Sequence, residues 1–263
     1  MTGGKICAII QARMNSSRLP GKVLKAVCGK PLLALMLERV ARARTLSRTV
    51  VATTESAEDE EIAKLCRKMD VACYRGSEDD VLDRYYQAAR AFDAQVIVRL
   101  TADCPLMDQA IIDRVIESFF AGRYDYASNT NPLPSTWPDG TDVEVFSWGA
   151  LERAWLESVK PSDREHVTFY LWNHPEKFQL HRVEHVPDWS KYRLTVDYPQ
   201  DLALVRSVFE AFYARNPAFT LSDIVTFLDA RPDIMQLNQT IGRNSGWQTA
   251  FEKDRLAGFG KGL

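Results

Sequence analysis

The sequence has no apolar run long enough to cross a bilayer and no surplus of charge of either sign. Its longest apolar stretch, PLLALML at residues 31–37, is far shorter than the roughly 18 residues of a transmembrane helix. Lys and Arg number 33 against 35 Asp and Glu, a formal net charge of −2. This balance argues against a basic nucleic-acid-binding protein and against a disordered tail. Since no signal-peptide pattern begins the chain, we expect a cytoplasmic protein without a membrane or nucleic-acid partner.

The sequence also lacks the cysteine patterns of a disulfide framework or a zinc site. Its 5 cysteines are scattered, with no C-x-x-C pair and no histidine at metal-ligand spacing. Cys104 lies close to a candidate site residue, but a small buried side chain is its simplest role. We therefore expect reduced thiols throughout.

The first half of the chain alternates strand-like and helix-like segments. Apolar strands are expected at ICAII, TVVATT, VACYRG and QVIVRLTAD, and the segments between them carry apolar stripes at helical spacing. This order predicts an α/β fold with a mainly parallel sheet.

A change of rhythm marks residues 124–190. Strand-like pieces (YDYAS, GTDVEVFS and FQLHRVEHV) surround two helical segments, at 148–159 and 163–174, which predicts an inserted mixed β-containing lobe. A strand at YRLTV and a long helix then resume the α/β pattern. The predicted organisation is one domain over 1–240, with the lobe inside it, and a C-terminal tail over 241–263 that frays at its end.

A basic loop follows the first strand. In IIQARMNSSRLPGKVL, residues 9–24, three basic side chains alternate with small residues, namely Arg13, Ser16, Ser17, Arg18, Gly21 and Lys22. Ligands of open α/β sheets bind beyond the carboxyl ends of the strands, and guanidinium, ammonium and backbone N–H groups suit phosphate oxygens. The loop therefore predicts a partner with several phosphates. It is not a Walker A loop, because Ser16 replaces the first glycine and Val23 follows Lys22.

Two aspartates stand after expected strands. Asp103 follows VIVRL and Asp197 follows YRLTV, each preceded by Arg-Leu-Thr and followed within two residues by proline. A parallel sheet would deliver both carboxylates to the edge that carries the basic loop. Taken singly, an aspartate after a strand is more often a turn residue or a helix N-cap. Taken together, they predict ligands for the Mg²⁺ that accompanies a bound triphosphate.

Six separated motifs between about residues 5 and 210 resemble one family. They are IIQARMNSSRLPGKVL, RGSEDDVLDRYYQAA, TADCPLMD, PDGTDVEVFS, REHVTFY and TVDYPQDL. In this order they are similar to the cytidylyltransferase family that contains the spore-coat polysaccharide protein SpsF, and more distantly to the CMP-Kdo and CMP-sialic acid synthetases. The resemblance implies a nucleotide-diphospho-sugar transferase fold, a Rossmann-like three-layer α/β/α sandwich with a small extension that often mediates dimers. A homodimer is therefore expected.

The resemblance also implies roles for individual residues. Arg13, Arg18 and Lys22 would surround the triphosphate of CTP, Asp103 and Asp197 would bind Mg²⁺, and Arg13, Lys22 and the two aspartates would be the catalytic set. The implied nucleotide contacts are Gln11, Ala12, Arg13, Ser16, Ser17, Arg18, Gly21, Lys22, Arg75, Thr101, Ala102 and Asp103. The chain departs from the family pattern at Ala102, Phe169 and Gln200, where relatives usually have Gly, Pro and Glu.

The acceptor side is expected in two further motifs. WPDGTDVEVFS offers Asp139 and Gly140 in a turn, and Asp142 and Glu144, which share one strand face by period two. DREHV adds Glu165 and His166, the latter as a proton acceptor or as a structural histidine. The same strand face is also consistent with plain solvation. Arg75 and Asp83 fit a second loop over the base or sugar, although Asp79 and Asp80 suit a helix N-cap.

These features predict a cytidylyltransferase that transfers CMP from CTP to a sugar or acidic sugar, with release of pyrophosphate. Such chemistry depends on positioning and charge stabilisation, so no side-chain nucleophile is required. Two alternatives stay open at this point. One is a glycosyltransferase of the same architecture that consumes a nucleotide-sugar, and the other is a nucleotide-binding protein without catalysis.

Overall fold

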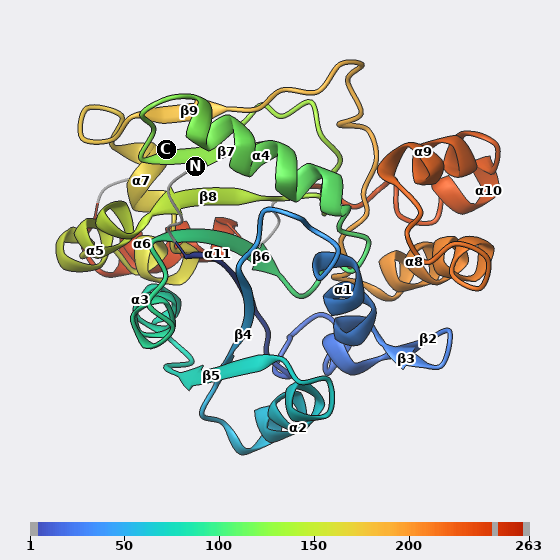
Figure 1. Cartoon of the computed structure of the whole chain (residues 1–263), viewed down its shortest axis with the longest axis horizontal. Coiled ribbons are helices and arrows are strands. Elements are labelled where there is room, and N and C mark those ends of the chain that lie inside the picture. The colour runs from blue at the N-terminus through green and yellow to red at the C-terminus, as the bar shows by residue number, and fades with distance from the viewer. Residues whose placement is uncertain (1–4, 244–246, 260–263) are drawn as a thin grey trace.

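The computed structural model describes residues 5–243 and 247–259, in which a seven-stranded sheet forms the centre (Figure 1). The strand order is β5-β4-β1-β6-β8-β7-β9. The strands are β1 (Ile6–Gln11), β4 (Arg48–Thr54), β5 (Ala72–Gly76), β6 (Val96–Thr101), β7 (Tyr126–Ser128), β8 (Glu144–Ser147) and β9 (Leu180–Arg182). Two short strands, β2 (Ala26–Val27) and β3 (Lys30–Pro31), form a separate antiparallel pair.

One strand of the main sheet runs against the others. β5, β4, β1 and β6 pair in parallel, as β7 and β9 do, whereas β8 is antiparallel to both β6 and β7. Because β8 is reversed, it begins beside the carboxyl-terminal part of β6, with Glu144 opposite Arg99. The loop that precedes β8 is thereby brought to the edge of the sheet where β1 and β6 end.

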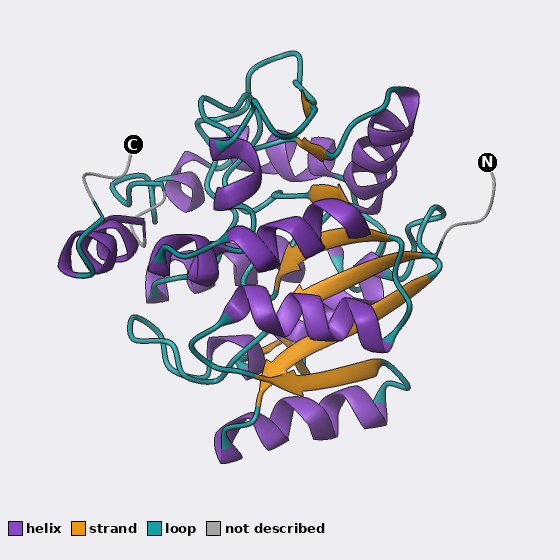
Figure 2. Cartoon of the chain, turned by 90° about the vertical axis from the view of Figure 1, so that its left-hand side faces the viewer, coloured by secondary structure: helices purple, strands orange, loops and turns teal. Residues whose placement is uncertain are grey.

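Helices cover both faces of the sheet, which confirms the predicted α/β/α layers (Figure 2). The helices are α1 (Leu32–Val40), α2 (Glu60–Lys68), α3 (Val81–Ala91), α4 (Gln109–Ala121), α5 (Trp148–Glu157), α6 (Pro161–His166), α7 (Phe169–Asn173), α8 (Pro199–Phe212), α9 (Leu221–Asp229), α10 (Pro232–Met235) and α11 (Trp247–Leu256), with 3₁₀ turns η1 (Lys22–Leu24) and η2 (Ala57–Asp59). Side chains of β1 alternate between two cores: Ala8 and Ile10 pack with α1, α4 and α8, whereas Cys7 and Ile9 pack with α3, α5 and α7. Burial on both faces explains the uninterrupted apolar run of this strand.

The segment 124–190 does not build a sheet of its own. Its three strands, β7, β8 and β9, extend the main sheet beyond β6. The lobe is therefore an insertion in sequence whose strands are continuous with the central sheet.

Two local predictions are wrong, and one on the tail is not tested. YRLTV forms no strand: only Arg193 makes a bridge, to Asp139. The backbone N–H groups of Leu194 and Val196 bond to the loop carbonyls of Asp139 and Asp103 and not to a neighbouring strand. The helix expected over 163–174 divides into α6 and α7 at Val167, which has φ 61°. Of the tail 241–263, residues Trp247–Leu256 form α11, and residues 260–263, where fraying is predicted, lie outside the described residues.

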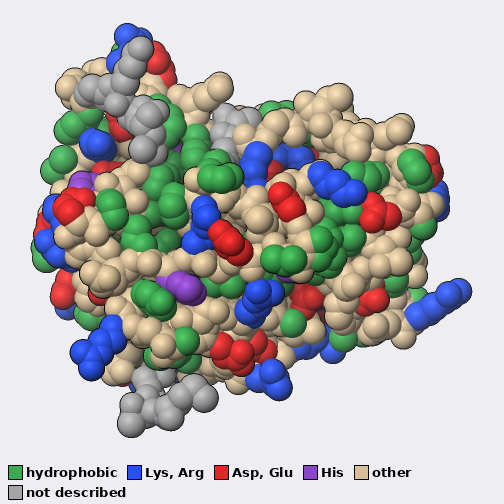
Figure 3. Space-filling model, turned by 90° about the horizontal axis from the view of Figure 1, so that it is seen from above, with side chains coloured by type: hydrophobic (Ala, Val, Ile, Leu, Met, Phe, Trp, Pro, Cys, Tyr) green, Lys and Arg blue, Asp and Glu red, His purple; other side chains and the backbone are tan. Residues whose placement is uncertain are grey.

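Within the described residues no helix has the length and apolarity needed to span a membrane. Figure 3 shows basic and acidic side chains interspersed over the face that it presents, without a broad basic patch. This mixture on that face agrees with the nearly neutral composition.

Candidate functional site

The basic loop and the two aspartates meet at the carboxyl edge of the sheet. The Nζ atom of Lys22 donates to Oδ2 of Asp103 at 2.8 Å and to Oδ1 of Asp197 at 2.9 Å. The guanidinium of Arg18 lies 2.7 Å from the same oxygen of Asp197. The predicted convergence of loop and carboxylates is thus present, while the metal and phosphate roles of these residues stay predictions.

Backbone geometry at Gly21 turns Lys22 inward. Gly21 has φ 65°, a left-handed conformation that side chains disfavour, and its N–H donates to the carbonyl of Met14 at 2.9 Å. A Cβ at this position would lie 3.3 Å from Cε of Met14. The 3₁₀ turn η1 starts at Lys22, whose side chain is only 11% exposed. The glycine therefore sets the direction from which the ammonium reaches the aspartates.

The three charges at the centre fix one another's protonation. Burial favours neutral aspartic acid, but the ammonium of Lys22 and the guanidinium of Arg18 outweigh it and lower the pKa of Asp197 to about 2. The same competition between burial and Lys22 lowers the pKa of Asp103. Burial opposes the charge of Lys22, yet the two carboxylates raise its pKa. All three groups are consequently ionised at neutral pH.

A third basic residue, Arg193, also contacts Asp197. Its guanidinium donates to Asp139 at 2.6 Å, to Asp201 at 2.9 and 3.1 Å and to Asp197 at 3.2 Å. Asp201 is fully buried and also accepts from the backbone N–H of Asp197 at 2.9 Å. Arg193 and Asp201 are site residues that the sequence reasoning missed. The Arg-Leu-Thr that precedes both Asp103 and Asp197 was the available signal, since Arg99 and Arg193 are both ion-paired beneath the site.

Gly140 permits a close backbone approach to this cluster. A Cβ on Gly140, which has φ 95°, would lie 2.3 Å from the backbone N of Thr195. The turn at Asp139 and Gly140 therefore packs directly on the 193–195 segment, where Asp139 N donates to Tyr192 O at 3.0 Å. Glycine is required here for packing, and this packing places Asp139 against Arg193.

Asp59, a third residue that the sequence did not point to, anchors the start of the basic loop. This buried carboxylate accepts from the backbone N–H of Met14 at 2.7 Å, and from the N–H and hydroxyl of Thr54 at 3.1 and 2.5 Å. It therefore ties the loop after β1 to the end of β4. In the sequence Asp59 lies among other acidic residues of a helix start, so no pattern distinguished it.

The remaining predicted nucleotide contacts lie at the ends of β1 and β6. Ala102 N donates to Gln11 O at 3.0 Å, and Ala12 N to Ala52 O at 3.1 Å, so the strand ends stay in register. Thr101 is half-buried beside Cys104, which is itself buried as expected. Ser16 is half-buried in the loop, and Arg13 and Ser17 are exposed on its surface.

Arg75 is placed differently from the prediction. Its guanidinium donates to the carbonyls of Thr54 and Ser56 at 2.9 and 2.7 Å and to Glu60 at 2.6 Å. The side chain thus fastens β5 to the β4–α2 connection and is occupied by protein partners. Asp80 caps α3 through the N–H of Asp83, which confirms the N-cap alternative for this residue.

Glu144 contradicts the expected acceptor face. Asp142 lies in the loop before β8, so the two carboxylates do not share a strand face. Glu144 is 1% exposed, forms a short ion pair with Arg99, and accepts from the hydroxyls of Tyr126 and Thr168 at 2.5 and 2.6 Å. These partners in the core occupy the carboxylate of Glu144. The period-two prediction is wrong because β8 begins only at Glu144, so Asp142 is not part of the strand.

The other acceptor-side residues divide between the surface and the interior. Glu165 pairs with Lys253 at 2.7 Å on the outside of α6. His166 stacks on Phe169 with ring centroids 4.4 Å apart, and burial together with the nearby Arg99 lowers its pKa to about 4. His166 is therefore neutral at physiological pH.

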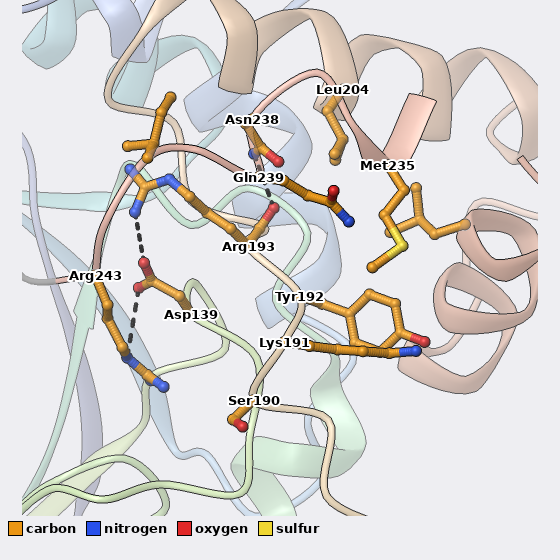
Figure 4. A pocket seen from close by; sticks show the side chains of 12 residues that line it. Asp139, Ser190, Lys191, Tyr192, Arg193, Leu204, Met235, Asn238, Gln239 and Arg243 are labelled. Atoms are coloured by element: carbon orange, nitrogen blue, oxygen red, sulfur yellow. Dashed lines mark hydrogen bonds and ion pairs between the residues drawn. The ribbon is translucent and has the colours of Figure 1, made fainter. Parts of the chain in front are cut away.

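A pocket of about 110 Å³ opens beside the Arg193 cluster (Figure 4). Asp139 lies between the guanidinium groups of Arg193 and Arg243, and Asn238 and Gln239 also line the pocket. Burial and the neighbouring Asp142 raise the pKa of Asp139 to about 7 in spite of the two arginines. Asn238 donates to Arg193 O at 3.1 Å and to Asp201 at 2.8 Å. The predicted acceptor residue Asp139 thus lines a cavity that adjoins the carboxylate cluster.

The donor set at the centre fits Mg²⁺ that is shared with phosphates. The carboxylates of Asp103 and Asp197 both lie against the ammonium of Lys22, and their side chains are 28% and 15% exposed. Among the described residues no group of three or more His, Cys, Asp or Glu is arranged to hold a metal. A protein site of one or two carboxylates completed by phosphate and water is the usual form for Mg²⁺.

A Rossmann-like sheet whose carboxyl edge bears a cationic loop and two ionised aspartates defines a site of the nucleotidyltransferase type. The family model described as cytidylyltransferase matches residues 7–225. The spore coat polysaccharide biosynthesis protein SpsF of Bacillus subtilis (strain 168) is 32% identical over 236 residues, 87% of this chain and 95% of SpsF. The chain belongs to the cytidylyltransferase family, and it is accordingly a CTP-dependent nucleotidyltransferase.

Two further relatives agree with this membership. The solved structure of a cytidylyltransferase from Leptospira borgpetersenii serovar Hardjo-bovis has a TM-score of 0.85 and 34% identity, covering 92% of this chain and 100% of that one. A 3-deoxy-manno-octulosonate cytidylyltransferase of Trichlorobacter lovleyi is 38% identical over 117 residues, 44% of this chain and 45% of the relative. The glycosyltransferase and non-catalytic alternatives find no support in these matches.

Proposed function

We propose that this chain transfers CMP from CTP to a hydroxyl of a sugar or acidic sugar in surface polysaccharide or related glycoconjugate synthesis. The observation that carries the proposal is the position of Lys22 between Asp103 and Asp197 at the end of the sheet. Family membership supports CTP as the donor. The names of two relatives, one in spore coat polysaccharide biosynthesis and one acting on 3-deoxy-manno-octulosonate, support this acceptor class.

The reaction forms one bond and breaks another at the same phosphorus. The acceptor hydroxyl oxygen attacks the α-phosphorus of CTP, the bond from that phosphorus to the bridging oxygen breaks, and pyrophosphate departs. The hydroxyl proton is lost to solvent or to a nearby base. Charge grows on the pyrophosphate as it leaves, so fixed cations lower the barrier.

Residues of the basic loop supply those cations. Arg18 and Lys22 already lie side by side against Asp197, and Arg13 is exposed on the same loop, available to a phosphate. Asp103 and Asp197 would hold Mg²⁺, which neutralises phosphate charge and orients the α-phosphate when bound. Arg193 and Asp201 keep Asp197 in place through both its side chain and its backbone N–H. Asp139, Asp142 and His166 are the groups left for the acceptor.

Pyrophosphate release tests the proposal. Purified protein is incubated with Mg²⁺ and CTP, UTP, GTP or ATP against a panel of acidic and neutral sugars, including 3-deoxy-manno-octulosonate. We expect release with CTP, and a loss of at least about 100-fold in the variants Asp103→Asn and Asp197→Asn. Asp70→Asn is the matched control, because Asp70 is exposed before β5 and has φ 56°, which asparagine tolerates. Parent-level release by the two folded site variants would refute the proposed roles.

We further propose that the protein forms a homodimer, from the family resemblance, and that it acts in the cytoplasm, from its nearly neutral composition. Sedimentation of the purified protein and fractionation of cells would measure them directly.

A further inference from the structure

The C-terminal helix α11 lies outside the part of the chain that the family model matches, yet it packs closely on the protein. Its Ala250 and Asp254 are 0% and 1% exposed. One carboxylate oxygen of Asp254 accepts from the backbone N–H of Ser162 at 2.8 Å, and the other accepts from its hydroxyl at 2.6 Å. Asp254 therefore satisfies the first turn of α6 from a distant part of the chain.

Aromatic side chains continue this contact toward His166. The ring of Trp247 meets that of Phe169 edge-on, with centroids 5.1 Å apart, and also contacts Trp172 at 5.8 Å. Phe251 stacks on Phe169 at 5.9 Å. Phe169 in turn stacks on the imidazole of His166 at 4.4 Å. The helix α11 thus holds, through one phenyl ring, the histidine that the sequence assigns to the acceptor side.

The turn between α6 and α7 requires such support. Val167 has φ 61° and ψ −57° and is 1% exposed, and Thr168 N donates to His166 O at 2.5 Å, which closes a γ-turn. A β-branched residue in this region is strained by on the order of 1–3 kcal/mol and persists only where its surroundings determine it. On one side Thr168 is held by Glu144, and on the other Phe169 is held by α11.

The same corner reaches the nucleotide side of the site. Nε of Arg164 on α6 donates to the carboxylate oxygens of Asp80 at 3.0 and 2.9 Å. Asp80 caps α3 and lies in the loop whose Glu78 accepts from Asn15 of the basic loop at 3.4 Å. A shift of α6 would therefore be transmitted both to His166 and to the loop beside the phosphate site.

We propose that α11 is a brace for the α6–α7 corner, with Asp254 as the positioning residue that keeps His166 and Arg164 in place. A role of this brace in acceptor binding rests on the proposed function, whereas the packing of α11 on the α6–α7 corner does not depend on it. The charged groups facing His166 are Arg99 of β6, Glu144 of β8, Glu165 of α6 and Lys253 of α11. In the described part of the chain, Nε2 of His166 is buried and makes no hydrogen bond. Because burial lowers the pKa of this imidazole, a looser corner that admits water should raise that pKa.

The full-length protein and the variants Asp254→Ala, Asp254→Asn and Trp247→Leu test the brace. Imidazole resonances are followed from pH 4.5 to 8, with His166 assigned by its loss in His166→Gln, while amide hydrogen exchange is measured on α6. The ring of His166 is expected to stay neutral across most of this range in the parent protein. In Asp254→Ala its titration should move upward by at least one pH unit, and the α6 amides should exchange at least about tenfold faster.

Asp254→Asn should stay close to the parent, because its amide oxygen still accepts from Ser162 N and the serine hydroxyl can turn to accept. If Asp254→Ala does not fold, Trp247→Leu, which leaves the cap intact, should show the same change in His166 to a smaller degree. An unaltered His166 titration and unaltered α6 exchange in a folded variant without the cap would overturn the brace. Failure of the parent protein to bind CTP would instead overturn the proposed function. The brace would still be tested by the titration of His166 and by amide exchange on α6.

Discussion

The ammonium of Lys22 lies 2.9 Å from a carboxylate oxygen of Asp197, although 175 positions separate the two residues in the chain. The same nitrogen lies 2.8 Å from Asp103. One buried ammonium therefore lies between two carboxylates and offsets their mutual repulsion.

Replacement of Lys22 by methionine should remove both catalysis and part of the stability. The change leaves two carboxylates with too little compensation, which costs about 3 kcal/mol in the free energy of unfolding. Pyrophosphate release should fall by at least about 100-fold, because a cation at the leaving group is lost. Urea unfolding and the pyrophosphate assay measure the two effects, with Lys25→Met as the control. A variant with parent activity would exclude Lys22 from the reaction.

Arg193→Lys should not be conservative. The guanidinium serves Asp139, Asp197 and Asp201 at once, and a single ammonium cannot reproduce that fork. We expect a loss of about 3 kcal/mol in urea unfolding, since buried carboxylates are left unpaired. The exposed pair Arg231–Asp233 provides the control, because Arg231→Lys should change stability by less than about 0.5 kcal/mol. Equal stabilities for the two lysine variants would contradict the role given to Arg193.

Asp59→Asn should weaken nucleotide binding more than it slows turnover. Asparagine offers one acceptor oxygen to three donors, so the start of the basic loop loses a fixed point. The KM for CTP should rise about tenfold, while kcat changes less than about threefold. Steady-state kinetics on Asp59→Asn and on the exposed neighbour Glu58→Gln separate this effect from a general loss of acidic charge. A pure fall in kcat would be the opposite of what the anchor predicts.

Gly21→Ala should destabilise the protein and misdirect Lys22. A left-handed conformation costs a non-glycine residue about 1–2 kcal/mol, and the new methyl group crowds Met14. The control, Gly149→Ala, should change stability in the opposite direction. Gly149 is exposed in α5 with open space around it, so alanine should stabilise the helix by up to about 1 kcal/mol. Thermal unfolding of both variants compares them, and equal melting temperatures would contradict the requirement at Gly21.

Asp163→Asn should stabilise the protein above about pH 4, by an amount that grows with pH and levels off above about pH 6. Burial, with a contribution from Asp254, raises the pKa of Asp163 to about 6. The native state therefore binds this proton more tightly than the unfolded chain, and stability is lost as pH rises from about 4 through about 6. Asparagine removes that loss, a gain on the order of 2 kcal/mol at pH 7.5 and close to none at pH 4. Unfolding curves of both proteins at the two pH values check the sign.

Much of the fold follows from local patterns in the sequence. The strands β1, β4 and β6 are largely apolar on both faces, and the helices between the strands carry clear apolar stripes, so periodicity alone finds them. The convergence of Lys22, Asp103 and Asp197 was also predictable, because it needs only the rule for strand ends, although YRLTV turned out to be an irregular segment.

Contacts between distant segments were beyond the sequence. Glu144 reads as a surface carboxylate until Arg99, Tyr126 and Thr168 are seen around it. Asp59 and Asp254 likewise act on loops and helices far away in the chain, so no spacing rule identifies them. Val167 interrupts a helical stripe because of tertiary packing, which outweighs local propensity.

The distance along the chain between Lys22 and Asp197 has a consequence during synthesis. The strands β1, β4, β5 and β6 are complete by residue 101, so the parallel half of the sheet can pair while the later part of the chain is still being translated. Lys22 then lacks its second partner, Asp197, until the segment that leads into α8 has been synthesised and packs on the sheet. Charge compensation at the site is thus a late event in vectorial folding, and nascent chains halted before residue 197 would present the basic loop to any polyanion nearby.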